Sequence, residues 1–374
     1  MNKCNTVTGC MLTPQGWVEG TLHYDERVRA IEGQPCSASA VRLAERIILP
    51  GFIDLHVHGG GGADAMQGGD SVATLARLHA RHGTTSLLAT TMAAPVDEIA
   101  DALRALNDTC RLRPAGAARV LGVHLEGPYL NRAKLGAQPD HACTAVMAQF
   151  DDFCRLAPVL LVTLAPEIPG HLDVIAQMRA RGIRVQIGHT MGSYEDGVAA
   201  LRHGATGFTH LFNAMSGLHH REPGMVGAAL AHAEYAELIP DLLHIHPGAM
   251  HAAMRAIPHL YCVTDSTAAA GMPDGQYKLG SHTVTKCLGG VRLSDGTLAG
   301  STLTMDQALR NLVSIGLDLE DASHRLSRNP ADYLGLSQRG RLAPDAWADM
   351  VVLNGALELT EVHIEGEQLV LTDV

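Results

Sequence analysis

Four polar side chains of this chain stand in or at the ends of short apolar runs, and their types suit a metal centre with a general base. Residues 120–125 form an apolar run that leads directly into Glu126, and a Gly-Pro pair follows. Runs of the same form end at His189 and Asp265, and another contains His210. One carboxylate and two imidazoles can hold a divalent ion, and a further carboxylate can move a proton. The sequence therefore predicts a catalytic metal centre whose ligands come from different strands.

The pair His56 and His58 is a second candidate for metal binding. Alternate residues of a strand point to the same face, so both imidazoles can reach one ion. On its own the pair also fits two histidines that are hydrogen-bonded at the mouth of a barrel. The preceding segment, residues 50–54, favours metal binding.

The chemistry-bearing residues fall on predicted strands that alternate with predicted helices. Residues 71–81 and 172–181, for example, carry apolar side chains at helical spacing. Eight strands in this alternation predict an α/β fold, a parallel (β/α)₈ TIM-type barrel, whose catalytic groups lie at the C-terminal ends of the strands. The predicted strands cover residues 52–58, 84–91, 119–125, 159–164, 184–189, 207–212, 237–244 and 260–264.

Both ends of the chain carry short runs that are typical of antiparallel strands. We predict that residues 1–49 and 341–374 pair into one small β-sandwich domain and that residues 50–340 form the catalytic barrel. The glycine run at residues 59–62 lacks the spacing of a phosphate-binding loop and is interpreted as a flexible turn.

Composition narrows the class of protein. The chain has 374 residues, 46% of them apolar, and a net charge of −11 without a Lys/Arg run, which gives little support to a nucleic-acid or membrane partner. Its eight cysteines are scattered without a C-x-x-C pair, which favours reduced thiols. With no secretion signal and no apolar run of the ~18 residues that a membrane helix needs, a cytoplasmic location is predicted.

Several motifs in one collinear order extend these predictions. The first-strand segment, residues 49–58, resembles the signature of the amidohydrolase superfamily. The whole set resembles the N-acetylglucosamine-6-phosphate deacetylases, a family within that superfamily. The resemblance implies metal-dependent hydrolysis of the acetamide of N-acetylglucosamine 6-phosphate to glucosamine 6-phosphate and acetate. The further motifs lie at residues 124–128, 163–167, 188–190, 209–215, 221–224, 263–265 and 300–305.

The resemblance also assigns roles to the predicted metal centre. It implies that Glu126, His189 and His210 form the principal metal site, with water activated by a divalent ion (Zn, Fe, Co or Mn). His56 and His58 are present in members that bind two ions, so one or two ions per chain are expected. Which ion binds is left open.

Asp265 and His244 match the family's acid–base and carbonyl-polarising residues. The resemblance implies that Asp265 takes a proton from the attacking water and gives it to the departing amine. It implies that His244 helps to hold the substrate and to polarise its carbonyl. The family's usual Asp-Gly-x-His motif is here Asp241-Leu-Leu-His244, which departs from the pattern.

Further residues match the family's substrate pocket. Asn213 and the backbone of Ala214 match one side of it, and Arg221 matches an arginine that reaches the phosphate from a neighbouring subunit. The resemblance therefore implies a homodimer and a small amino-sugar phosphate as partner. Gln138 replaces a histidine of many relatives, and its amide can donate a hydrogen bond to the substrate but cannot titrate.

Three alternatives remain open at this stage. The first is a deacetylase for N-acetylgalactosamine 6-phosphate, which differs at one hydroxyl. The second is a D-aminoacylase-like amidohydrolase without a phosphate requirement, which Arg221 and Asn213 disfavour. The third is a non-enzymatic barrel, which should have lost ligands or the base, whereas Glu126, His189, His210 and Asp265 are all present.

Overall fold

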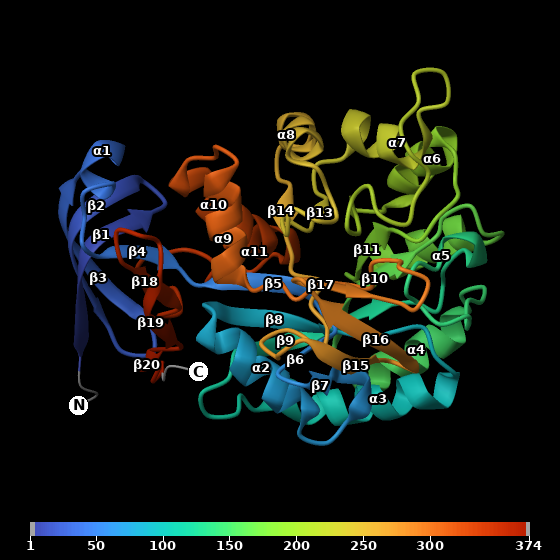
Figure 1. The fold of residues 1–374 in the computed structure, drawn as a ribbon, viewed down its shortest axis with the longest axis horizontal. Coiled ribbons are helices and arrows are strands. Elements are labelled where there is room, and N and C mark those ends of the chain that lie inside the picture. Colours follow the sequence, from blue (N-terminus) through green and yellow to red (C-terminus); the bar gives the residue numbers. More distant parts are fainter. Residues whose placement is uncertain (1–3, 372–374) are drawn as a thin grey trace.

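Residues 4–371 of the computed structural model are described here, and they form a barrel with a separate β sheet beside it (Figure 1). Six parallel strands form one curled sheet, and two more form a parallel pair. These eight strands are β5 (Phe52–Val57), β8 (Thr84–Thr90), β9 (Arg119–Glu126), β10 (Val159–Leu164), β11 (Arg184–Ile187), β12 (Gly207–Phe208), β13 (Glu237–Leu238) and β14 (Tyr261–Cys262).

The pair β13 and β14 completes the barrel through backbone contacts at both sides. The amide of Leu211, just after β12, donates to the carbonyl of Glu237 at 2.9 Å. On the other side Val57 of β5 forms a parallel bridge with Ser266. The predicted barrel is therefore confirmed, with its strands in the predicted order.

The sixth and eighth predicted strands, over residues 207–212 and 260–264, end earlier than predicted, at Phe208 and Cys262, and the seventh, over residues 237–244, was also too long. The strand ends at Leu238, Pro240 follows, and the Asp241 carboxylate accepts the amides of Leu243 and His244 at 2.9 Å each. These bonds close a turn and remove the segment from the sheet, so His244 lies in a loop.

Helices follow the barrel strands and pack around the barrel, except for one short helix, Ala38–Val41, that precedes the first barrel strand. The helix predicted over residues 71–81 is observed with the same limits, and the one predicted over 172–181 begins and ends one residue earlier. The helices are α1 (Ala38–Val41), α2 (Ser71–Arg81), α3 (Val96–Arg111), α4 (Met147–Leu156), α5 (His171–Ala180), α6 (Tyr194–His203), α7 (Gly224–His232), α8 (Pro247–Ala256), α9 (Met305–Ser314), α10 (Leu319–Leu326) and α11 (Arg328–Leu334), with 3-10 turns η1 (Ala65–Gln67) and η2 (Arg132–Lys134).

Segments from both ends of the chain form the second sheet, as predicted. It is one seven-stranded sheet in the order β20-β19-β18-β4-β1-β2-β3. Buried side chains such as Met11, Leu22 and Met350 give it a core of its own. We propose domain limits at residues 49 and 341. Its strands are β1 (Asn5–Thr13), β2 (Gly16–Tyr24), β3 (Val28–Pro35), β4 (Ile47–Pro50), β18 (Met350–Leu353), β19 (Leu359–Ile364) and β20 (Glu367–Gln368).

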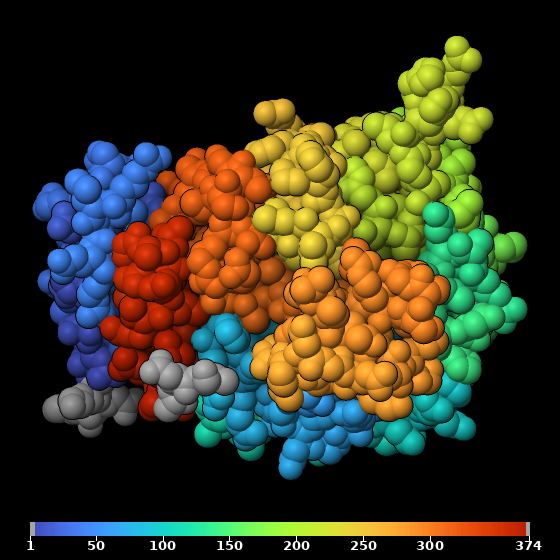
Figure 2. All heavy atoms as spheres, viewed as in Figure 1, coloured from blue at the N-terminus to red at the C-terminus, as the bar shows by residue number. Residues whose placement is uncertain are grey.

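A three-stranded antiparallel ribbon, which sequence reasoning did not predict, is inserted after the last barrel strand. It consists of β15 (Gly275–Leu279), β16 (His282–Cys287) and β17 (Gly290–Arg292) and forms the orange surface in the lower centre of Figure 2. Its apolar side packs against Met92 and Ala269. The ribbon therefore covers part of the barrel surface.

The glycine run after the first barrel strand forms a short two-stranded hairpin, whereas a flexible turn was predicted. β6 (Gly59–Gly60) pairs with β7 (Ala63–Asp64). A side chain at Gly59 would meet the carbonyl of Ala63 at 2.5 Å, so this position needs glycine. None of the helices within residues 4–371 combines the length and apolar character of a membrane span.

Candidate metal centre

The carboxyl ends of the barrel strands bring the predicted ligands together. Glu126 is the last residue of β9, while His189, His210 and Asp265 lie just beyond their strands with φ angles of 48°, 28° and 50°. Left-handed backbone is costly for residues with a side chain and occurs mainly where function requires it. These three residues therefore turn out of their strands in a strained conformation and place their side chains at the barrel mouth.

One oxygen of Glu126 meets two imidazoles. Glu126 Oε1 lies 3.1 Å from His189 Nε2 and 3.1 Å from His210 Nε2, and the two nitrogens are 3.1 Å apart. His189 Nδ1 donates to the carbonyl of Lys134 at 2.8 Å, which leaves Nε2 with its lone pair facing the carboxylate. The three predicted principal ligands thus converge on one point.

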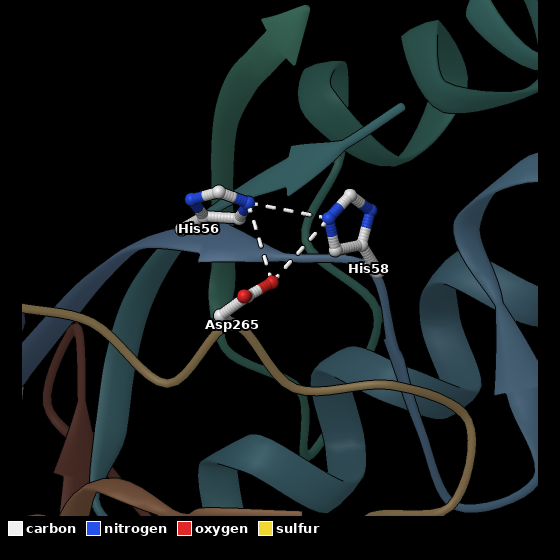
Figure 3. Close-up of side chains that lie close together, drawn as sticks. All are labelled: His56, His58 and Asp265. Carbon is white, nitrogen blue, oxygen red and sulfur yellow. Dashed lines mark hydrogen bonds and ion pairs between the residues drawn. The ribbon is translucent and has the colours of Figure 1, made fainter. Parts of the chain in front are cut away.

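The other oxygen of Glu126 faces a second group formed by His56, His58 and Asp265 (Figure 3). The two Nε2 atoms are 3.2 Å apart and lie 3.4 and 3.5 Å from Asp265 Oδ1. Glu126 Oε2 is 3.0 Å from His58 Nε2 and 3.4 Å from His56 Nε2. Glu126 therefore stands between two clusters of potential ligands.

The chemistry of these side chains fits a divalent cation. Every one of them is buried, and imidazole nitrogens and carboxylate oxygens are typical ligands of zinc and of similar ions. Lone pairs that face one another at about 3 Å repel unless a positive charge lies among them. The two three-residue groups would hold such an ion through Glu126, His189 and His210, or through His56, His58 and Asp265.

The short distances between these side chains shift the pKa values of Glu126 and His189. Burial alone would raise the pKa of Glu126, but the surrounding imidazoles, above all His56, hold it well below its usual range. The adjacent carboxylate of Glu126 likewise holds the pKa of His189 above its usual value, although burial would lower it. The carboxylate is therefore ionised and ready to bind a cation.

Close backbone packing fixes Asp265 at the centre. Its amide donates to the carbonyl of His56 at 3.0 Å, and its carbonyl accepts the amide of Ser301 at 2.7 Å. A side chain at Gly300 would come within 2.8 Å of the Asp265 carbonyl, so glycine is required there. Asp265 was predicted only as the base. Its carboxylate also lies close enough to His56 and His58 for the three side chains to bind one ion.

A cavity of about 310 Å³ opens above these ligands. Its lining includes the predicted substrate residues Gln138, Asn213, Ala214 and His244, together with Lys134. The structure thus brings four of the five predicted substrate-binding residues to the same cavity as the ligands.

Two of the cavity residues have partners of their own. His244 Nδ1 lies 2.7 Å from Asp241, whose charge raises the pKa of His244 although burial would lower it. Gln138 donates to Glu126 Oε2 at 2.7 Å and accepts the amide of Ala93 at 2.7 Å. Gln138 therefore contacts a predicted metal ligand as well as lining the cavity, and its substrate contact stays a prediction.

Arg221 lies away from this cavity. It is exposed on the loop before α7 and lines a separate surface hollow with Tyr194 and Glu222. Within its own chain Arg221 is not among the described residues that line the catalytic cavity.

Two buried residues near the ligands were not singled out from the sequence as site residues. Glu237 Oε2 lies 3.0 Å from His56 Nδ1, and His124 packs with its ring 4.5 Å from that of His56. The sequence did offer a signal for Glu237, because it is a charged residue inside the apolar run 236–239. Such a residue on a buried barrel strand must face polar partners.

A (β/α)₈ barrel that carries these ligands at the carboxyl ends of its strands has the architecture of a metal-dependent hydrolase. The model of the Amidohydrolase family matches residues 47–370. The chain belongs to the amidohydrolase family and is a hydrolase that acts on carbon–nitrogen bonds.

Curated relatives and solved structures support the same assignment. The chain is 37% identical over 370 residues to an N-acetylgalactosamine-6-phosphate deacetylase of Escherichia coli O157:H7, covering 96% of this chain and 97% of the relative. It is 38% identical over 347 residues to an N-acetylglucosamine-6-phosphate deacetylase of Vibrio furnissii, covering 91% and 86%.

Among solved structures, a mutant N-acetyl-D-glucosamine-6-phosphate deacetylase of Mycobacterium smegmatis, in complex with N-acetyl-D-glucosamine-6-phosphate, superposes with a TM-score of 0.89. The two are 33% identical, with 98% of this chain and 99% of the other covered.

Proposed function

We propose that this chain hydrolyses the acetamide of N-acetylglucosamine 6-phosphate to glucosamine 6-phosphate and acetate. The observation that carries the proposal is the convergence of Glu126, His189 and His210 beside Asp265, on the cavity that also contains Asn213 and His244. Relatives named for this reaction and the related structure with this sugar phosphate bound support the choice of substrate.

Each residue of the centre has a distinct task in this reaction. A divalent ion held by Glu126, His189 and His210 supplies Lewis-acid activation of water and of the acetamide carbonyl. Asp265 accepts a proton from the attacking water and then donates it to the amine nitrogen as the carbon–nitrogen bond breaks. His244, oriented through its Nδ1 by Asp241, presents Nε2 to the carbonyl oxygen.

Recognition of the phosphate draws on two cationic residues. Lys134 is the one Lys or Arg among the described residues that line the cavity. Because the protein has a net charge of −11, binding of a phosphate group requires a local positive charge such as this one. We assign Arg221 to the phosphate of a neighbouring active site in a homodimer. The loop before α7, which carries Arg221, stands out from the surface at the upper right of Figures 1 and 2, as a reach into a second subunit requires.

We also propose one or two divalent ions per chain, chosen among zinc, iron, cobalt and manganese, with His56 and His58 holding the second. A cytoplasmic location is proposed from the eight cysteines, all of which carry free thiols.

The epimeric substrate, N-acetylgalactosamine 6-phosphate, is the second candidate, because the E. coli relative that carries its name aligns over 370 residues. The deciding experiment measures acetate release from both 6-phosphates and from unphosphorylated N-acetylglucosamine, alongside elemental analysis of the protein. We expect the highest kcat/KM on N-acetylglucosamine 6-phosphate. A higher value on the galactosamine epimer would transfer the assignment to it, and equal values with and without phosphate would contradict a sugar-phosphate enzyme.

A further inference from the structure

Below the metal centre, a hydrogen-bonded chain of side chains crosses the inside of the barrel. All eight barrel strands contribute to it, either from within the strand or, for Thr209, from the residue that directly follows it. The members are His56, Thr90, His124, Thr163, Gln186, Thr209, Glu237 and Tyr261.

The contacts join neighbouring strands and, through Gln186 and Tyr261, also cross from β11 to β14. The hydroxyl of Tyr261 donates to Glu237 Oε1 at 3.2 Å, and Gln186 donates to Tyr261 at 2.5 Å. Thr209 donates to Gln186 at 2.9 Å and shares a hydrogen bond of 2.7 Å with Thr163. The chain continues from Thr163 to His124 Nε2 at 2.7 Å and reaches Thr90 at 3.5 Å. These polar side chains thus satisfy one another in the interior.

Glu237 is the member that touches the metal ligands. Its Oε2 lies 3.0 Å from His56 Nδ1 and accepts the backbone amide of His210 at 3.3 Å. One fully buried oxygen therefore contacts a ligand side chain of one cluster and the backbone of a ligand in the other.

We propose that Glu237 is a positioning residue that fixes His56 as an Nε2 ligand. A carboxylate only accepts hydrogen bonds, so His56 Nδ1 must carry the hydrogen and Nε2 is left with the lone pair that faces His58 and Asp265. All three groups that contact Glu237, from His56, His210 and Tyr261, are then donors. A glutamine would have one accepting oxygen for them and would turn an N–H toward a donor.

The group His56, His124 and Glu237 has atoms close enough to hold an ion, but its polar atoms already have hydrogen-bond partners. His56 Nδ1 is bonded to Glu237, and His124 Nε2 to Thr163. This cluster therefore supports the metal centre rather than forming a third one.

The inference rests on the proposed function in that it needs an ion at His56 and His58, but its test needs no substrate. Metal-free full-length chain is titrated with Co²⁺ and the visible absorbance is followed. The wild type should take up two equivalents, and E237Q should bind one of them roughly 10-fold to 100-fold more weakly, as for other groups that orient metal ligands. The other equivalent should change less than about 3-fold.

Asp54 offers a matched control, because it is also a fully buried carboxylate, on the same strand as His56. It accepts the amides of His56 and Thr264 at 3.2 Å each and the hydroxyl of Thr264 at 2.6 Å, and none of its hydrogen bonds within residues 4–371 is to an imidazole. D54N should lower stability and leave both Co²⁺ affinities within about 3-fold, since it removes no contact to a ligand ring. In a chain that carries H56N, adding E237Q should have no further effect on the remaining affinity.

A measurement on the wild type covers the case in which E237Q fails to fold. Nitrogen NMR of the zinc-loaded chain should show His56 protonated at Nδ1 and bound through Nε2. A hydrogen on Nε2, a wild type that binds one equivalent, or equal weakening of both sites in E237Q and D54N would each overturn the proposal. Acetate release by the wild type from the sugar phosphate tests the proposed function separately.

Discussion

The two ends of strand β9 hold different charged clusters, one partly buried and one fully buried. At its start, Arg119 donates to both oxygens of Glu365 at 2.8 and 2.7 Å, and Arg339 and Arg113 reach the same carboxylate at 2.5 and 3.2 Å. At its end, Glu126 is surrounded by imidazoles. The first cluster joins the barrel to the turn after β19, and the second forms the metal centre.

The difference lies in the kind of nitrogen that meets the carboxylate. Guanidinium groups are always charged and only donate, so they complete a structural ion pair without any further group. Imidazoles at neutral charge keep one lone pair, which an added cation can use. A carboxylate that meets arginines therefore marks the stabilising end of this barrel, and one that meets several histidines marks the reactive end. In such barrels the active site lies at the C-terminal ends of the strands, and the opposite face contributes to stability.

The sharpest way to break this comparison is to neutralise each end of β9 in turn. E126Q should lose bound metal and lower kcat/KM by at least about 10³-fold, because Lewis-acid activation is worth several kcal/mol. R119Q should keep metal and kcat while lowering the thermal midpoint by about 2–6 °C. Elemental analysis, kinetics and calorimetry of the two variants provide the check, and metal loss in R119Q would contradict the division.

Low pH should remove the stability that Glu365 and its arginine partners contribute at the start of β9. Burial alone would raise the pKa of Glu365, but Arg119 and Arg339 lower it from 4.5 to about 2. Because the folded pKa is depressed, this stabilisation is complete above pH 4.5 and is lost as the pH falls toward 2. E365Q should therefore cost roughly 3 kcal/mol at neutral pH and progressively less below pH 4.5. Denaturant unfolding of both proteins across this range measures it, and a pH-independent difference would refute the assigned cause.

At the reactive end, the R221A variant tests whether Arg221 recognises the phosphate of the substrate or only supports the fold. Removal of a charge-assisted contact of about 1.5–3 kcal/mol should lower kcat/KM of R221A on the 6-phosphate by about 10-fold to 100-fold. Turnover of the unphosphorylated sugar should hardly change. Equal losses on both sugars would show that Arg221 acts through folding or dimer assembly instead.

The smallest expected effect concerns Leu242, which has φ of 64° in the turn before His244. The related motif has glycine at this position, which tolerates such a backbone. L242G should raise the free energy of unfolding by about 0.5–1 kcal/mol, the relief of left-handed strain less the added chain entropy. Chemical denaturation checks the sign, and a destabilised variant would show that the Leu242 side chain, 37% exposed, still packs usefully.

Sequence patterns predicted the parts of this molecule that repeat a simple rule. Each predicted apolar run contains a barrel strand. Glu126, His189 and Asp265 were found because they end such runs, and His210 because it lies within one. His244 was assigned to a strand because the turn made by Asp241 depends on side-chain hydrogen bonds that periodicity does not report.

The support below the ligands was harder to predict. Gln186 and Glu237 lie within short apolar strands, where one polar residue is ambiguous until the closed barrel shows what it faces. The ribbon at residues 275–292 was missed because its strands alternate polar and apolar residues over only a few positions. Arg221 illustrates a further limit, since its predicted partner is in another subunit.

The most direct test of the account is the turnover of D265N on N-acetylglucosamine 6-phosphate, with the metal content measured in the same sample. Asparagine keeps the shape of the side chain and cannot exchange the proton, so kcat should fall by roughly 10²-fold to 10⁴-fold while the ion at Glu126, His189 and His210 remains bound. Near-normal turnover with that ion in place would contradict the assignment of Asp265 as the group that moves the proton.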